Sequence, residues 1–233
     1  MALNPTFLRD LITLKKRGFL DGYRSVVEIG AQQFDDHVIR SSLLDQAAQL
    51  FGGVKPSVEP VGALGITSKS PPGRLLWTAL GFQSQAIDLV GGDIVIDLNR
   101  GEVPLHYRGI FDFAVNCGTT EHIANQGNAF AAIHDLVRAG GLMYHQVPAF
   151  GQIDHGFFGY QPKFFHRIAK CNDYGWALFI MSEGSGAREV PRYLNDDNAV
   201  EREMPLPTAM TCGVLRIALI KRDDRPFVMP ADA

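Results

Sequence analysis

Apolar residues recur along the chain with two spacings, one typical of helices and one typical of strands. Residues 4–20 carry apolar side chains every three or four positions, and Asn4 stands before Pro5 where a helix would begin. Further helices are expected at residues 42–51, 74–81, 128–141 and 161–175. Short runs rich in β-branched and aromatic residues predict strands at residues 24–31, 84–89, 93–98, 111–116, 141–148, 176–182 and 213–221.

Strands that alternate with helices predict a mainly parallel sheet with right-handed crossovers. The last two expected strands have no clear helix between them, so they can pair as an antiparallel hairpin. We therefore expect one α/β domain over residues 1–233, with a Rossmann-like, mostly parallel seven-stranded sheet that ends in this hairpin.

Two segments stand apart from this alternation. Residues 35–72 form a long insertion after the first strand, and its second half is rich in Pro, Gly and Ser. The insertion is a candidate lid over a substrate, and a surface decoration is the equal alternative. Residues 223–233 are expected to form a flexible tail.

Composition narrows the class of protein. The chain has 22 Lys and Arg against 25 Asp and Glu, a net charge of −3 without a clustered basic excess, which argues against nucleic-acid binding. Its three cysteines are far apart and its apolar runs are too short to span a membrane, so a cytoplasmic protein with reduced thiols is expected. The amphipathic first helix could cover the sheet or a second subunit, which leaves a homodimer open.

Polar residues stand at the same end of five successive expected strands. These residues are Glu28, which is followed by Gly30, and then Asp88, Asp97, Asn116 and His145. In an open α/β sheet, ligands bind outside the carboxyl ends of the strands. Each carboxylate also has a structural alternative, since Asp88 could cap a turn before Gly91 and Asp97 could begin a turn into Arg100. Together they favour a ligand with a vicinal diol and a heterocyclic base, because an ionised carboxylate accepts from both hydroxyls.

These stretches resemble the class I S-adenosylmethionine-dependent methyltransferases, in the branch that acts on small molecules. The resemblance rests on VVEIGA, AIDL, VIDLN and FDFAVNCGTTEHIANQ, followed by LVRAGG and YHQVP, and it covers residues 25–174. It implies S-adenosylmethionine as cofactor, methyl transfer to a hydroxyl or amine of a small molecule, and a sheet with a terminal hairpin.

The resemblance also implies a role for individual residues. Glu28, Gly30 and Ala31 would line the amino-acid end of the cofactor, with Gln32 next to them. Asp88 would hold the ribose hydroxyls and Asp97 the adenine amino group, while Leu98 would pack on the ring and Asn116 would border the methionine moiety. Because this cofactor has no phosphate, the missing glycines after Gly30 are not required as a phosphate cradle.

Candidate catalytic residues are His155 and His145, which stand near the end of the fifth expected strand. The loop around His155 contains Phe150, Phe157, Phe158 and Tyr160, which could wall an apolar or aromatic acceptor. His145, His155 and His166 do not have the spacing of a metal site, so no metal is expected.

Two other functions stay open at this point. An NAD-dependent oxidoreductase would need three glycines after the first strand and an acidic residue about twenty positions further on, and the sequence offers neither. The non-enzymatic alternative is a methyltransferase fold without turnover that acts as a binding or scaffold protein. It is motivated by the loop after the first strand, which keeps only the first of the usual glycines. The sequence does not name the methyl acceptor.

Overall fold

The computed structural model describes residues 3–34, 38, 41–53, 71–183, 189–191 and 212–231. The chain forms two compact units, Met1–Val95 and Ile96–Ala233. The expectation of a single domain remains a prediction, and each unit is described by itself.

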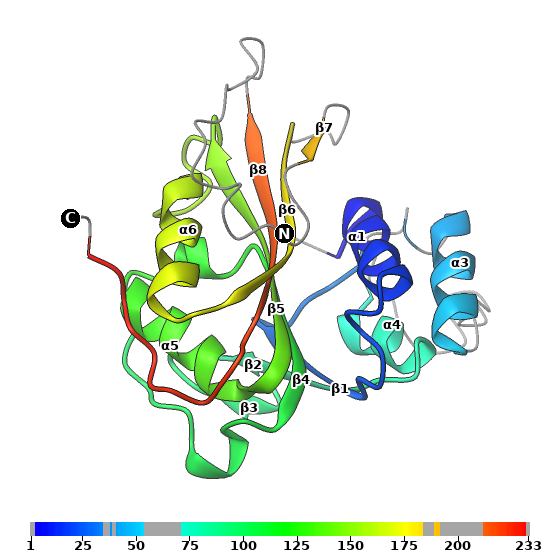
Figure 1. The fold of residues 1–233 in the computed structure, drawn as a ribbon, viewed down its shortest axis with the longest axis horizontal. Helices are drawn as coiled ribbons and strands as arrows, with labels where there is room; N and C mark the ends of the chain where they lie inside the picture. Colours follow the sequence, from blue (N-terminus) through cyan, green and yellow to red (C-terminus); the bar gives the residue numbers. More distant parts are fainter. Residues whose placement is uncertain are drawn as a thin grey trace. The chain divides into compact units, whose positions relative to one another are not determined.

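The first unit is built on three parallel strands in the order β3-β2-β1, with β1 at Ser25–Ile29, β2 at Gln83–Asp88 and β3 at Ile94–Val95. Its helices are α1 (Pro5–Lys16), α3 (Ser42–Phe51) and α4 (Gly73–Ala79), and α1 lies beside α3 in blue and light blue (Figure 1). The third strand is shorter than predicted and ends two residues before Asp97.

Helix α1 begins where the sequence predicts it. Asn4 is the N-cap, and its Oδ1 accepts from Phe7 N at 2.9 Å, while Pro5 stands in the first turn. The apolar face of α1 is buried, and Phe7 packs edge-on against Trp77 of α4 with ring centroids 5.7 Å apart. These contacts bring α1 and α4 into one core.

The second unit has strands in the order β4-β5-β8-β6-β7. Their bounds are β4 Phe111–Cys117, β5 Val137–Phe150, β6 Gly175–Glu183, β7 Glu189–Pro191 and β8 Gly213–Ile220. β4 and β5 are parallel, whereas β8 is antiparallel to both β5 and β6. The predicted terminal hairpin is confirmed, as is the Rossmann-like α/β fold class, and the short β7 is a strand that the sequence did not predict.

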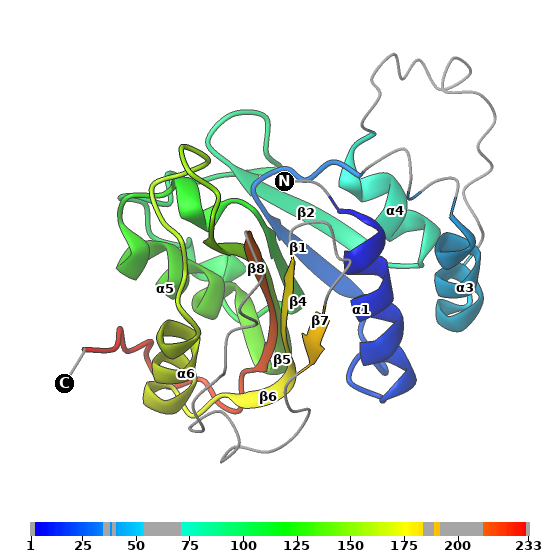
Figure 2. The same cartoon turned by 90° about the horizontal axis from the view of Figure 1, so that it is seen from above.

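Helices α5 (Gln126–Leu136) and α6 (Pro162–Cys171) lie on the same face of this second sheet (Figures 1 and 2). Phe130 of α5 packs against Phe165 of α6 with ring centroids 5.8 Å apart. Two 3-10 turns, η1 (Leu105–Tyr107) and η2 (Thr120–His122), precede and follow β4.

The boundary between α5 and β5 differs from the prediction. The helix was expected to continue to residue 141, but it ends at Leu136 and β5 begins at once. Arg138 pairs with Asp112 of β4 at 2.6 Å, and a Cβ on Gly141 would press on Asp112 O at 2.8 Å. Strand pairing therefore decides the conformation of a stretch whose apolar spacing favours a helix.

Several other expectations concern the periphery. Within the described residues, no helix is long and apolar enough to cross a membrane. All three cysteines are free. Of the insertion at residues 35–72, the helix α3 is observed as predicted, while most of the rest lies outside the described residues and its role as a lid remains a prediction.

Candidate functional site

The turn that follows β1 is shaped by Gly30 and Gln32. Gly30 has a φ of +75°, in the left-handed region that favours glycine, and its N–H donates to Ile87 O at 2.8 Å. The buried amide of Gln32 folds back on this turn and donates to Ile29 O at 2.9 Å and to Gly30 O at 3.2 Å. Gly30 is thus required by the turn itself, and Gln32 fills space that further glycines would leave open.

Glu28 is buried between β1 and the start of α4. Its Oε1 accepts from Trp77 Nε1 at 2.7 Å, and its Oε2 accepts from Gln32 N at 3.0 Å. Burial raises the pKa of Glu28 to about 7, although both donors act in the opposite direction. Gly73 permits this approach, because a Cβ there would collide with Glu28 Oε1. Glu28 therefore fastens α4 to β1.

Asp88 lies at the end of β2, directly beside the turn after β1. Its Oδ2 accepts from Ala31 N at 2.9 Å and its Oδ1 accepts from Val90 N at 3.2 Å. The second contact is the turn-capping role that the sequence allowed as an alternative. The first contact joins two strand ends that are 57 residues apart in the sequence.

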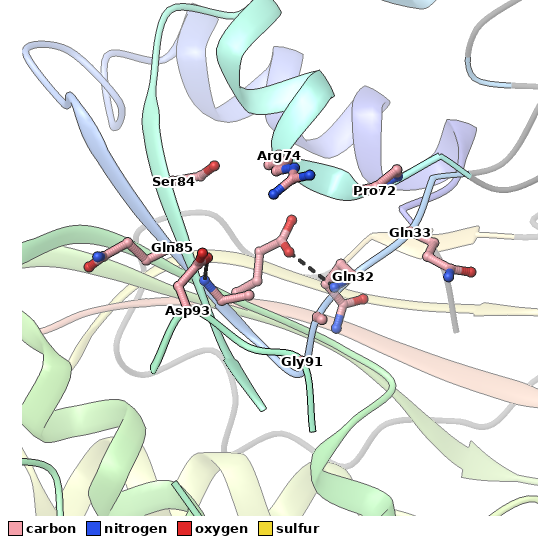
Figure 3. A pocket seen from close by; sticks show the side chains of 11 residues that line it. Gln32, Gln33, Pro72, Arg74, Ser84, Gln85, Gly91 and Asp93 are labelled. Atoms are coloured by element: carbon pink, nitrogen blue, oxygen red, sulfur yellow. Dashed lines mark hydrogen bonds between the residues drawn. The ribbon is translucent and has the colours of Figure 1, made fainter. Parts of the chain in front are cut away.

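A cavity of about 250 Å³ lies in the first unit next to these residues (Figure 3). Three of its lining residues, Glu28, Ala31 and Gln32, are predicted cofactor residues. Arg74 of α4 and Ser84 of β2 also line it, and sequence reasoning missed both. No motif marks them, because only the packing of α4 against the sheet brings them to the same space.

In the second unit, Asp97 and Leu98 belong to a tight turn. Asp97 Oδ1 accepts from Asn99 N at 2.9 Å, and Asp97 O accepts from Arg100 N at 3.0 Å and from Gly101 N at 2.6 Å. This is the structural alternative that the sequence left open for Asp97. Leu98 is buried.

Asn116, next to the last residue of β4, and His145, in the middle of β5, form a buried polar pair. Asn116 Nδ2 donates to Thr120 Oγ1 at 2.8 Å and lies 3.2 Å from His145 Nδ1. Both side chains are buried, and burial lowers the pKa of His145 to about 3. His145 is therefore neutral near pH 7, and the pair ties β4, β5 and η2 together.

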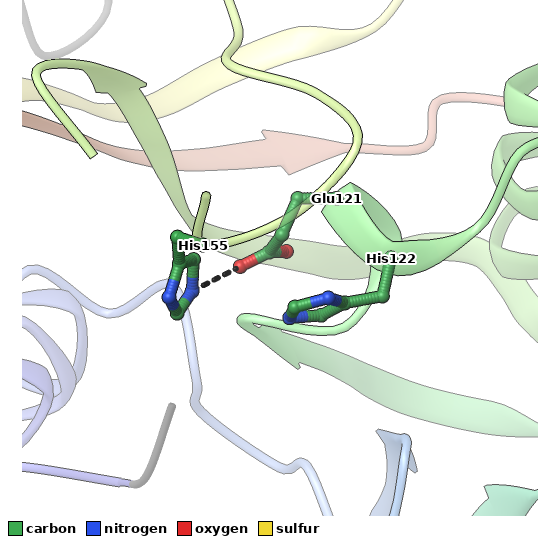
Figure 4. Close-up of side chains that lie close together, drawn as sticks. All are labelled: Glu121, His122 and His155. Carbon is green, nitrogen blue, oxygen red and sulfur yellow. Dashed lines mark ion pairs between the residues drawn. The ribbon is translucent and has the colours of Figure 1, made fainter. Parts of the chain in front are cut away.

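A second cluster joins Glu121 and His122 of η2 with His155 of the loop after β5 (Figure 4). Glu121 is fully buried, and its Oε1 lies 3.5 Å from His155 Nε2. Burial raises the pKa of Glu121. The sequence singled out His155 but did not predict these neighbours, because their meeting depends on the path of the loop.

The aromatic loop around His155 is fastened at Tyr160, whose N–H donates to Pro148 O and whose hydroxyl donates to Gln126 Oε1, both at 2.7 Å. A cavity of about 180 Å³ lies against this loop, and Phe150, His155 and Phe158 line it. Two further aromatic residues were expected to line an acceptor site. Phe157 is 72% exposed, whereas Tyr160 is buried.

No protein-family model and no curated protein matches this sequence. The fold is similar to solved structures of S-adenosylmethionine-dependent methyltransferases, the family that the sequence resembles. One is the 1,6-didemethyltoxoflavin-N1-methyltransferase of Burkholderia thailandensis, with bound 1,6-didemethyltoxoflavin and S-adenosylhomocysteine. It has 13% identity and a TM-score of 0.47, over 93% of this chain and 78% of that chain.

Two further structures are similar. A methyltransferase of Thermotoga maritima, described as a possible histamine N-methyltransferase, has 13% identity and a TM-score of 0.40 over 93% of this chain and 92% of that chain. The trans-methyltransferase CalH in complex with S-adenosylhomocysteine has 11% identity and a TM-score of 0.43, over 91% of this chain and 55% of that chain.

The predicted site residues thus fall into two groups by their contacts. Gly30, Ala31 and Asp88 surround one turn in the first unit, and Glu28 and Gln32 are buried beneath it. Asp97, Leu98, Asn116, His145 and His155 belong to the second unit, where His155 keeps a partly exposed side chain.

Proposed function

We propose that this chain transfers the methyl group of S-adenosylmethionine to a hydroxyl or amine of a small molecule. The observation that carries the proposal is the position of the Asp88 carboxylate beside the turn at Gly30 and Ala31. Ligands of open α/β sheets bind outside the carboxyl ends of parallel strands, where these residues stand. A carboxylate there can accept from both hydroxyls of a ribose.

The other cofactor contacts are predictions within this proposal. Glu28, Gly30, Ala31 and Gln32 are assigned to the amino-acid end, which is supported by the cavity that three of them line. Asp97, Leu98 and Asn116 keep the adenine and methionine roles that the family resemblance implies.

Methyl transfer from a sulfonium breaks the sulfur–methyl bond while the acceptor oxygen or nitrogen forms a bond to the same carbon, and the acceptor then loses its proton. Positioning of the two reactants can supply roughly 7–11 kcal/mol of the barrier. Of the two predicted catalytic histidines, His155 is favoured as the proton acceptor because its side chain is partly exposed beside a cavity. Burial and a pKa of about 3 favour a structural role for His145.

A catalytically silent binding or scaffold protein is the second candidate. One observation favours it, since the chain's own donors already bind Glu28 and Asp88. An NAD-dependent oxidoreductase is the third, and the Gln32 side chain in place of later glycines speaks against it.

Calorimetric titration of the chain with S-adenosylhomocysteine tests the proposal. We expect saturable binding, and we expect Asp88→Asn to weaken it at least about tenfold, because hydrogen bonds to a charged group are worth about 1.5–3 kcal/mol. Asparagine keeps an acceptor for the Ala31 N–H, so the turn is retained. Asp21→Asn is the matched control, since Asp21 is an exposed carboxylate that pairs with Lys15.

Each other outcome contradicts part of the proposal. No heat and no thermal shift with the cofactor would favour the scaffold protein. Equal affinities of wild type and Asp88→Asn would remove the ribose assignment. A fluorescence change of NADH on mixing would favour the oxidoreductase.

A further inference from the structure

Glu121 is a buried carboxylate whose two oxygens have no hydrogen-bond donor on another residue that the structure describes. The side chain is fully buried, and its closest charged partner is His155, whose Nε2 lies at the ion-pair distance of 3.5 Å from Oε1. An isolated buried carboxylate is costly unless it is paired or coordinates a metal. The buried oxygens face the imidazoles of His122 and His155 (Figure 4).

We propose that Glu121, His122 and His155 bind a divalent first-row transition metal ion, with Zn²⁺ as the preferred ion. One donor atom from each of the three side chains lies within 4.8 Å of the other two. The Oε1 of Glu121 and the Nε2 of His155 are 3.5 Å apart. Two ligands at about 2.0–2.1 Å from a tetrahedral Zn²⁺ lie roughly 3.4 Å from each other, so this pair already has the required separation.

The backbone holds His155 in this place. Phe157 N donates to Glu121 O at 2.8 Å, and Phe158 N lies 3.2 Å from the same oxygen. Gly156 lies so close that an added Cβ would be 3.0 Å from Glu121 Cγ and 3.3 Å from His122 Nδ1. The loop is therefore fastened directly over η2, and the ligands come from two segments fixed to each other.

The donor set selects the class of ion. Two imidazoles and one carboxylate suit Zn²⁺ and its neighbours, whereas Mg²⁺ and Ca²⁺ prefer oxygen ligands. Three protein ligands leave a fourth position for water or another ligand. His122 is exposed and His155 half-buried, so an ion can reach the buried carboxylate from solvent.

This site differs from the histidine set considered in the sequence, which lacked metal-site spacing and led to the expectation of no metal. It uses one of those histidines, His155, with two residues 33 and 34 positions earlier. The site is independent of methyl transfer itself but excludes the catalytic role proposed for His155, because an ion on Nε2 would prevent this imidazole from accepting a proton. Cation binding is measured without the methyl donor, so failure of one proposal leaves the other intact.

The test is metal binding by the untagged full chain, measured with Zn²⁺ by equilibrium dialysis and elemental analysis and with Co²⁺ by visible absorption. We expect one equivalent of Zn²⁺, a ligand-field spectrum of tetrahedral Co²⁺ and a higher melting temperature on metal addition. Glu121→Gln and His155→Asn should each weaken binding at least about tenfold. His106→Asn is the matched control, since His106 is an exposed histidine of the same unit.

Two results would overturn the site. Absence of a bound equivalent in the wild type would mean that Glu121 and His155 form only an ion pair. Equal binding by wild type, Glu121→Gln and His155→Asn would place the ion elsewhere. His155→Asn keeps the test valid if Glu121→Gln does not fold, because His155 lies on a loop with a partly exposed side chain.

Discussion

Glu28 is a carboxyl group enclosed by its own chain, with Trp77 Nε1 and Gln32 N as donors. Desolvation favours the neutral form and the two donors favour the charged form, and desolvation is the larger effect. The resulting pKa of about 7 links the stability of the first unit to pH, whether or not Glu28 also contacts a ligand.

The sign of this link can be measured. Between the ordinary pKa of 4.5 and the folded-state pKa of about 7, the folded protein holds a proton at Glu28 that the unfolded chain has lost. The contribution of Glu28 to the free energy of unfolding therefore falls with rising pH, by up to about 3 kcal/mol. In urea unfolding, the free energy of unfolding of Glu28→Gln should rise relative to that of wild type by most of this amount between about pH 5 and pH 8.

Glu102→Gln is the control for that series, because the Glu102 side chain is 88% exposed. Its difference from wild type should change little with pH. If the free energy of unfolding of Glu28→Gln relative to wild type stays constant or falls as the pH rises over this range, the raised pKa of Glu28 is wrong.

The sequence identified which side chains stand at strand ends but not what they contact. A turn was the structural alternative for Asp88 and Asp97, and both accept backbone N–H donors two residues further on. The contact of Asp88 with Ala31 and that of Glu121 with His155 join residues far apart in the sequence. Local chemistry can predict the contacts within a turn, whereas the contacts between residues far apart in the sequence depend on how the chain packs.

At the scale of elements, α4 is a short helix whose Trp77 combines a buried hydrogen bond with aromatic packing. Trp77 donates to Glu28 and packs edge-on against Phe7 and Phe82, with ring centroids 5.7 and 5.8 Å away. The packing of Trp77 does not depend on pH, whereas its hydrogen bond to Glu28 is strongest when Glu28 is ionised. Measurements at two pH values therefore separate the loss of packing from the loss of the donor.

Trp77→Phe removes the Nε1–H that stabilises ionised Glu28. We expect its destabilisation to be larger near pH 8 than near pH 5, by about 1.5–3 kcal/mol, the value of a hydrogen bond to a charged group. Trp176→Phe, at a buried tryptophan of β6 that packs on Phe179, should give a cost without this trend. A Trp77→Phe cost that is the same at both pH values would contradict the account of α4.

Elements were predictable where local signals and tertiary contacts agree. The cap and proline at the start of α1 gave its first residue, and the apolar runs gave the main strands. The predicted end of α5 was wrong because Val137 pairs with Phe111 of β4 and Arg138 forms an ion pair with Asp112, contacts that the helical spacing of the side chains does not reveal.

At the scale of the whole chain, the strand orders in the two units establish the fold class. β8 lies between β5 and β6 and is antiparallel to both, as the terminal hairpin predicted. The chain after β8 runs over the second unit, where Val228 N donates to Asn172 Oδ1 at 2.7 Å and Arg225 O accepts from His134 Nε2 at 2.8 Å. Flexibility of residues 223–233 remains a prediction, and motion there would have to break these bonds.

Function at this scale depends on whether the strand ends hold an adenosine compound. Cytoplasmic location, a homodimer and the absence of nucleic-acid partners also remain predictions from the sequence. None of them changes the chemistry proposed for the turn at Gly30.

A crystal structure of the chain with S-adenosylhomocysteine tests the central claim most directly. We expect the ribose hydroxyls within hydrogen-bonding distance of the Asp88 carboxylate, and the ligand's amino-acid end near Gly30 and Ala31. A ligand bound with its ribose away from Asp88, or crystals that take up no ligand at saturating concentration, would contradict it.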